Sequence, residues 1–296
     1  MIEEMSSLGI MLGKEPRLVD VIKEQYAYRA QVWPIDDSQT YKGRVLVMHN
    51  PGEDVTLYHR LIDVLGKHGY ETFYCQMTNV YESSLDIYNE MSRILDLCIN
   101  DIDSQSYVKS HKLHLIGHFI GGSRILNYCV KGKFKHRIKS IISINPFLSA
   151  CPEFASLISQ TTTPFLALVL PKSKTSALPI KYEHLTSDRR WLSYLQSKKF
   201  NFSTITANYL YEIQHISHVL QNKRKFNDFA VHNVLLIHSK KDPVSTVKGT
   251  EYFAKYCPAE NIRLLEYEKG LNNLFIETDD VFDKLSDDLI TWLNEN

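Results

Sequence analysis

Leu115-Ile116-Gly117-His118-Phe119-Ile120-Gly121-Gly122 is the stretch around which the rest of this 296-residue chain is arranged. An apolar run enters a glycine-rich turn, and a helical pattern continues from Ser123 to Val130. The frame is that of G-x-S-x-G, a sharp strand-to-helix turn that lifts a serine hydroxyl above the carboxyl edge of a parallel sheet. Phe119 stands in the place of that serine, and a phenyl ring cannot attack a carbonyl. The stretch therefore predicts the turn without its usual nucleophile.

Strand and helix patterns alternate on both sides of this turn. The apolar run from Arg44 to Met48 is typical of a strand that is buried on both faces of a parallel sheet. A helix from Tyr58 to Leu65 and a strand from Glu71 to Cys75 complete a strand–helix–strand unit. Further helix is expected at 85–99, and further strands at 138–144, 231–238 and 262–267. This alternation predicts an α/β fold with a doubly wound, mostly parallel sheet.

The alternation stops after Phe147 and resumes near Ala230. We interpret the interruption, at about 148–230, as an inserted helical cap within a single domain that covers 25–296. Residues 1–24 are expected to form an N-terminal extension, with a short helix at 16–24. Apolar spacing predicts helices at 187–197, 205–221 and 281–293.

Composition excludes several classes of protein. The 34 basic and 34 acidic residues cancel, so no general attraction to nucleic acid is expected. No apolar run is long enough to span a bilayer, and no secretory signal is visible, so we predict no transmembrane segment and a cytoplasmic location. The five cysteines are scattered and never spaced as C-x-x-C, which argues against a zinc site or a disulfide scaffold. We predict no cofactor and no metal.

Four local patterns resemble one family. The segment 49–53, His-Asn-Pro-Gly-Glu, is similar to an H-G-x-G-E turn, and 117–122 is similar to G-H-S-M-G-G. The segment 185–188 is similar to L-T-x-D, and 239–244 is similar to a loop that bears a catalytic acid. From about residue 26 to 295, the chain resembles the α/β-hydrolase fold and, within it, the serine hydrolase group of monoacylglycerol lipases and lysophospholipases. This resemblance implies an ester hydrolase ancestry.

The resemblance also implies where a catalytic triad would lie. Its nucleophile, acid and base positions fall on Phe119, Asp242 and Asn272, and a one-residue gap would move the last to Asn273. No histidine follows His238, although these hydrolases order their triad as serine, acid and histidine. We therefore predict a vestigial triad with no intact catalytic residue.

Other positions of the implied site also depart from the family. The expected oxyanion-turn and pocket positions are His49, Asn50, Gly52, His118 and Ile120. Asn50 replaces a glycine of the oxyanion turn, and a side chain there could restrict the approach of a carbonyl. The segment 76–83 lacks the acid and the glycines of the family's D-x-x-G-x-G-x-S turn.

Structural roles compete with catalytic ones at several of these residues. Asp242 is interpreted as a carboxylate that caps a turn. Ser123 lies one helical turn past Phe119, where a hydroxyl is expected to bond a backbone carbonyl. The scattered histidines lack the spacing of a metal site and are interpreted as packed or surface side chains.

Three functions follow from these patterns. The first is a catalytically inactive pseudo-hydrolase that binds another protein through its cap or another exposed face, as an interaction or scaffold module. The second is a pseudo-lipase that binds a lipid or acyl ligand. The third is a carboxylic ester hydrolase, similar to monoacylglycerol lipase, with relocated catalytic residues. The missing serine and histidine lead us to place the first ahead of the others.

Overall fold

The computed structural model describes residues 8, 14–23, 26–50, 52–76, 87–105, 113–155, 167–170, 173–175, 180–200 and 205–296. Most of the turn at 76–83 lies outside these residues, as does His111.

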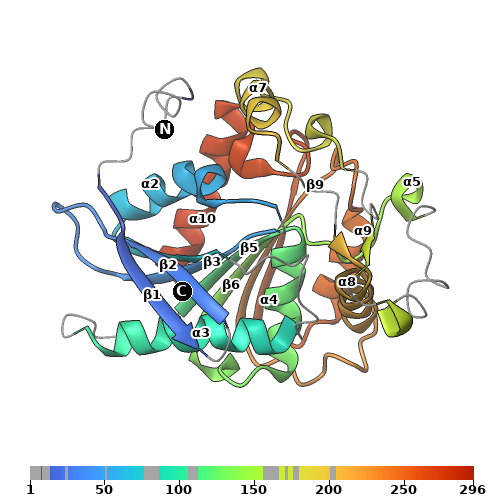
Figure 1. Cartoon of the computed structure of the whole chain (residues 1–296), viewed down its shortest axis with the longest axis horizontal. Coiled ribbons are helices and arrows are strands. Elements are labelled where there is room, and N and C mark those ends of the chain that lie inside the picture. Colours follow the sequence, from blue (N-terminus) through green and yellow to red (C-terminus); the bar gives the residue numbers. More distant parts are fainter. Residues whose placement is uncertain are drawn as a thin grey trace.

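A twisted sheet of eight described strands forms the centre of the molecule (Figure 1). The strand order is β1-β2-β4-β3-β5-β6-β9-β10. Strand β2 is antiparallel to both of its neighbours, β1 and β4, and the strands from β4 to β10 in this order pair in parallel. The strands are β1 (Arg17–Lys23), β2 (Tyr26–Trp33), β3 (Gly43–Met48), β4 (Tyr70–Cys75), β5 (Leu113–His118), β6 (Ile138–Ile144), β9 (Asn233–Ser239) and β10 (Asn261–Tyr267). This is the mostly parallel sheet that the sequence predicts.

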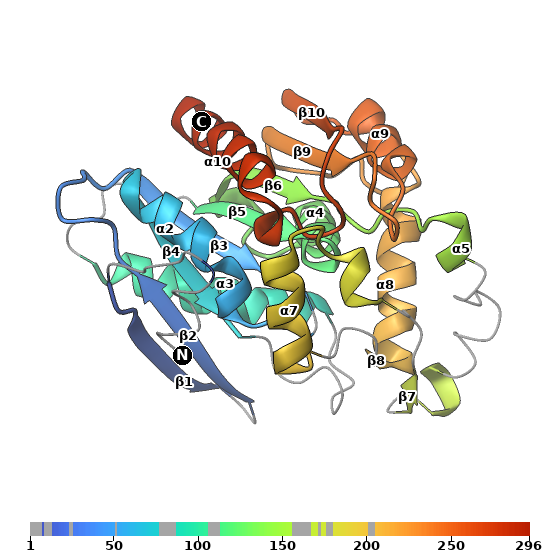
Figure 2. The ribbon, with the colours of Figure 1, turned by 90° about the horizontal axis from the view of Figure 1, so that it is seen from above.

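Helices cover both faces of the sheet, as the view from above makes clear (Figure 2). One face packs on α3 (Ile87–Asp103), α4 (Ile120–Lys131) and α9 (Val247–Tyr256). The other face packs on α2 (His59–Lys67) and α10 (Asp279–Glu295). Alternate residues of β3 explain this arrangement, because Leu46 contacts the first layer while Val45 and Val47 contact the second.

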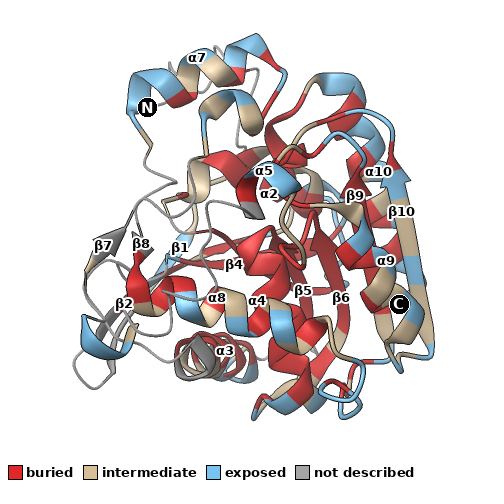
Figure 3. Cartoon of the chain, turned by 90° about the vertical axis from the view of Figure 1, so that its right-hand side faces the viewer, coloured by how far each residue is buried: buried red, intermediate tan, exposed pale blue. Residues whose placement is uncertain are grey.

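The chain leaves the sheet between β6 and β9. This segment contains α5 (Pro152–Ala155), α7 (Arg189–Lys198), α8 (Ala207–Leu220) and a small sheet of β7 (Lys174–Thr175) and β8 (Ile205–Thr206). Its helix α8 packs against α4, and both contribute to the buried interior coloured red in Figure 3. The proposed domain limits, including a cap at 148–230, stay a prediction.

The N-terminal region differs from expectation. The predicted helix at 16–24 is wrong, because residues 17–23 form β1 and pair with β2 along its whole length. The proline that can begin a helix is equally compatible with the entry to an edge strand. The sheet therefore extends into what we expected to be an extension outside the domain.

Among the helices of the described part of the chain, none is long and apolar enough to cross a bilayer.

Candidate functional site

The elbow between β5 and α4 is the centre of the candidate site. Phe119 has φ 51° and ψ −112°, a backbone conformation that side-chain-bearing residues rarely adopt. Glycines make this turn possible: a Cβ on Gly121 would lie 2.2 Å from the carbonyl oxygen of Met48, and one on Gly117 would lie 2.8 Å from the backbone of Gly121. The sequence thus keeps the sharp turn while changing the residue at its tip.

Phe119 is 2% exposed, in the core layer that contains α4. Its ring meets that of Phe147 edge to face, with centroids 5.2 Å apart. The backbone N–H of Phe119 donates to the carbonyl oxygen of Ile144 over 2.9 Å. The elbow is therefore held at its backbone by β6 and at its tip by apolar contact.

A buried polar network lies beside the elbow, in the loop that follows β3. The Asn50 side-chain amide donates to Glu53 Oε1 over 3.0 Å and to His118 Nδ1 over 2.8 Å. On its other side, His118 Nε2 donates to the backbone oxygen of Asn272 over 2.8 Å. This pattern requires His118 to be the neutral tautomer with its proton on Nε2. The imidazole thus joins the loop after β3 to the loop after β10.

Asn50 also contacts the elbow directly. Its Oδ1 accepts the backbone N–H of Ile120 over 2.8 Å and that of Gly121 over 3.2 Å. These are the first amides of α4, which have no partner within the helix. Two neighbours complete the turn: His49 donates from Nδ1 to the backbone oxygen of Asn50 over 2.7 Å, and Gly52 adopts a positive φ of 79°. Burial lowers the pKa of His49.

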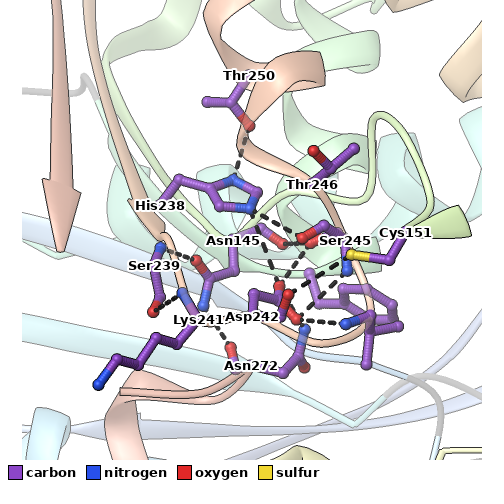
Figure 4. Close-up of polar contacts among 12 residues, drawn as sticks. Asn145, Cys151, His238, Ser239, Lys241, Asp242, Ser245, Thr246, Thr250 and Asn272 are labelled. Atoms are coloured by element: carbon purple, nitrogen blue, oxygen red, sulfur yellow. Dashed lines mark hydrogen bonds and ion pairs between the residues drawn. The ribbon is translucent and has the colours of Figure 1, made fainter. Parts of the chain in front are cut away.

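Asp242 lies at the carboxyl end of the sheet, after β9 (Figure 4). Its Oδ1 accepts the backbone N–H of Val244 over 2.8 Å, which is the turn-capping role expected of it. Its Oδ2 accepts the Ser245 hydroxyl over 2.6 Å and the Asn272 side-chain amide over 3.0 Å. Asp242 and Asn272 are therefore in direct contact, as the implied triad positions require, but their assignment as a vestigial triad stays a prediction.

Among the described residues, the histidine His238 comes within 4.0 Å of Asp242, and its ring is committed to other partners. Its Nε2 faces the backbone oxygen of Ser245 at 3.3 Å, and its Nδ1 faces the Thr250 hydroxyl at 2.8 Å. Nε2 is 4.0 Å from Asp242 Oδ2. Burial lowers the pKa of His238, so the ring is neutral at neutral pH and donates its one proton to a backbone carbonyl. It has no free nitrogen for a reacting group.

Ser123 behaves as a structural side chain. It is 2% exposed, and its hydroxyl lies within hydrogen-bond distance of the backbone oxygens of Phe147, at 2.9 Å, and Phe119, at 3.2 Å. The Ser123 hydroxyl therefore lies between the backbone oxygens of the elbow residue, Phe119, and of Phe147 in the segment after β6.

Sequence reasoning missed Asn145, the residue after β6. It has φ 43°, accepts the Ser239 N–H over 2.7 Å, and donates to the backbone oxygen of Asn272 over 2.6 Å. Asn145-Pro146 at the end of a buried strand was the available signal, since Asn is one of the few residues that tolerate positive φ. Asn145 thus ties β9 to the loop that bears Asn272.

No group of three or more His, Cys, Asp or Glu side chains in the described residues is arranged to hold a metal ion. The charged side chains near the elbow bind one another or backbone groups instead.

Comparisons with known proteins agree with the fold described above. The family model for serine aminopeptidase, S33, matches residues 39–279. Monoglyceride lipase of Saccharomyces cerevisiae is 25% identical over 282 residues, which cover 89% of this chain and 88% of that protein. A crystal structure of a soluble variant of that lipase, in complex with a substrate analog, superposes with a TM-score of 0.83 at 23% identity and covers 95% of this chain and 96% of that one. Monoacylglycerol lipase of Paleococcus ferrophilus gives a TM-score of 0.74 at 14% identity, with 90% and 98% coverage.

These matches confirm the resemblance to monoacylglycerol lipases, and they correct the functional prediction. Our first reading, an inactive module for protein interaction or scaffolding, is wrong, because the family and the relatives that cover nearly the whole chain are hydrolases. That reading gave the missing serine and histidine more weight than the continuity of the remaining sequence. The comparisons favour the lipid and ester readings.

Proposed function

Because this chain belongs to the serine aminopeptidase S33 family, we propose that it binds a long-chain acyl ester of the monoacylglycerol type at the elbow beneath α8. The observation that carries the proposal is the relationship to yeast monoglyceride lipase over 89% of the chain. A relationship of that extent includes the sheet, the elbow and the segment between β6 and β9.

The chemistry of the elbow supports an acyl ligand. Phe119 and Phe147 present an aromatic pair at the position where a family member holds the reacting end of its substrate. Tyr209 and Ile213 of α8 belong to the same apolar cluster. An alkyl chain that moves from water into contact with such side chains gains about 0.8 kcal/mol for each of its buried CH₂ groups.

Lipid analysis of the purified protein tests this proposal. We expect organic extracts of the full chain to contain acylglycerol or fatty acyl lipid in near-stoichiometric amount by mass spectrometry. A delipidated sample should take up a 1-monoacylglycerol in a saturable titration. Phe119→Arg, which places a charge on the aromatic pair, should abolish uptake, while Lys284→Ala on the exposed side of α10 should not change it. Extracts without acyl lipid, together with no saturable uptake, would refute the proposal.

A second candidate is hydrolysis of the bound ester, which the family membership itself favours. The reaction would add water across the ester bond and release a fatty acid and glycerol. Any serine that serves it must lie outside the elbow tip, because Phe119 occupies that place. Labelling by a fluorophosphonate probe tests this candidate, and Ser123→Ala tests the nearest serine. Absence of both labelling and fatty acid release from a 1-monoacylglycerol would remove it.

A further inference from the structure

The two first amides of α4 already have an acceptor. In G-x-S-x-G elbows, the N–H of the residue after the nucleophile binds the oxygen of the reacting carbonyl. That residue here is Ile120, and its N–H donates to Asn50 Oδ1, as does the N–H of Gly121. The oxygen of a side-chain amide therefore takes the place that the oxygen of a ligand carbonyl would occupy.

The orientation of the Asn50 amide is fixed by its surroundings. Rotating it by 180° would turn its NH₂ group toward two N–H donors and its oxygen toward the Glu53 carboxylate. Asn50 is 6% exposed, so water does not readily replace these partners. The following residue, Pro51, has no backbone N–H to offer a carbonyl. Both sources of carbonyl-binding amides are thus reduced, the elbow by Asn50 and this loop by Pro51.

Asn272, whose backbone oxygen binds His118 Nε2, carries a side-chain acceptor without a partner among the described residues. Asn272 is 1% exposed and its Nδ2 is held by Asp242, while its Oδ1 has no hydrogen-bond partner among the described residues. The backbone oxygen of the same residue binds His118, next to the elbow tip. Buried acceptors without partners are costly and rare, which points to a donor that a ligand would supply.

We propose that the side-chain oxygen of Asn50 occupies the two amides that would otherwise bind the ester carbonyl of a ligand. The polar end of the ligand is therefore recognised through a hydroxyl that donates to Asn272 Oδ1, and not through its ester carbonyl. This inference rests on the proposed function and specifies its ligand. The class it selects is a long-chain glyceride or glyceryl ether with a free hydroxyl. The carbonyl oxygen of an ester that lacks a hydroxyl would compete with Asn50 Oδ1 for the same amides. Such an ester also has no donor for Asn272 Oδ1.

Three lipids with the same sixteen-carbon chain separate the two modes of recognition. 1-O-Hexadecylglycerol has hydroxyl donors and no carbonyl, methyl palmitate has a carbonyl and no donor, and 1-palmitoylglycerol has both. For the wild-type chain we expect Kd values of the ether and the acylglycerol to agree within about twofold, and methyl palmitate to bind at least tenfold more weakly. Fatty acid release is followed in parallel, so that hydrolysis is not mistaken for weak binding.

Two substitutions test the roles of Asn50 and Asn272 separately. Asn50→Gly should strengthen binding of 1-palmitoylglycerol relative to the ether by about five- to tenfold, because the amides of Ile120 and Gly121 become available. Asn272→Leu should weaken the ether by a similar factor. Asn261→Ala is the matched control, since it removes an asparagine whose side-chain amide donates to Asn233 Oδ1 over 3.2 Å, at the opposite end of β10 from the loop that bears Asn272. Its ratio of ester to ether affinity should equal that of the wild type.

The outcomes are distinguishable. If none of the three lipids binds the wild-type chain, the proposed function fails and this inference fails with it. If the lipids bind but the wild type prefers the acylglycerol over the ether by tenfold or more, only the inference is overturned. Amide hydrogen exchange gives a readout without ligand: exchange at Ile120 and Gly121 should accelerate in Asn50→Gly and not in Asn261→Ala. Unchanged exchange in a folded Asn50→Gly protein would also overturn it.

Discussion

The strained backbone of Phe119 predicts an unusual order of stability among its variants. Replacing the ring by Ala removes a 2%-exposed side chain and its contact with Phe147, which typically costs 3–5 kcal/mol, so we expect about 4 kcal/mol. Ala keeps a Cβ at φ 51°, whereas Gly does not. Release of that strain contributes about 1–3 kcal/mol, and the greater freedom of Gly in the unfolded chain offsets about 0.4–1 kcal/mol of it. Phe119→Gly should therefore be more stable than Phe119→Ala by about 1 kcal/mol.

Urea unfolding followed by tryptophan fluorescence measures this difference, provided that the variants share one m-value. Phe147 supplies the matched control, because it is also buried but has no positive φ. There the usual order should hold, with Gly less stable than Ala by about 0.5–1 kcal/mol. If Phe119→Gly proves less stable than Phe119→Ala, the elbow is not strained in solution and the reasoning fails.

Three other perturbations follow from the structure. Phe119→Ser combined with Asn272→His should raise ester hydrolysis above the wild-type rate in a fatty acid release assay, and neither single change should do so, because nucleophile and base act as a unit. His59 is 6% exposed, and burial lowers its pKa to about 4, so its neutral form is favoured by folding and stability is lost as pH falls below about 6.5. His59→Phe should therefore remove about 2 kcal/mol from the stability difference between pH 7.5 and pH 5 in urea titrations; an unchanged difference would contradict this. Arg44→Met should cost about 3–5 kcal/mol by removing the guanidinium that lies 2.5 Å from the buried Glu71 carboxylate, and adding Glu71→Leu should recover part of that loss in the same assay.

The fold was predictable because its signals are local. Glycines mark the elbow by necessity, since Gly121 lies against the backbone of β3, and apolar runs mark strands that are buried on both faces. The strand at 17–23 was not predictable in this way. An edge strand depends on a partner elsewhere in the chain, and its own pattern is weak.

The position of the candidate site was predictable from the sequence, but its hydrogen bonds were not. Asp242 and Asn272 follow from family spacing, and their contact follows from adjacent strands ending at one edge of the sheet. The bond from Ile120 to Asn50 joins residues 70 positions apart, and no local pattern encodes it. The function was misjudged for a related reason: two missing residues are conspicuous in a sequence, whereas 25% identity spread over 282 residues is not.

The hydrogen bonds of the site also show why restoring the serine and the histidine alone should give only weak hydrolysis. Phe119→Ser and Asn272→His supply a nucleophile and a base, yet the amide of Ile120 still donates to Asn50. Loss of one oxyanion donor typically costs about a hundred- to a thousandfold in kcat. Asn50 is joined to the backbone of Asn272 through the ring of His118, so His118 connects the loop after β3 to the loop after β10. Adding Asn50→Gly should therefore raise the rate of the double variant much further than it raises that of the wild type, because the freed amides can act only where a nucleophile is present.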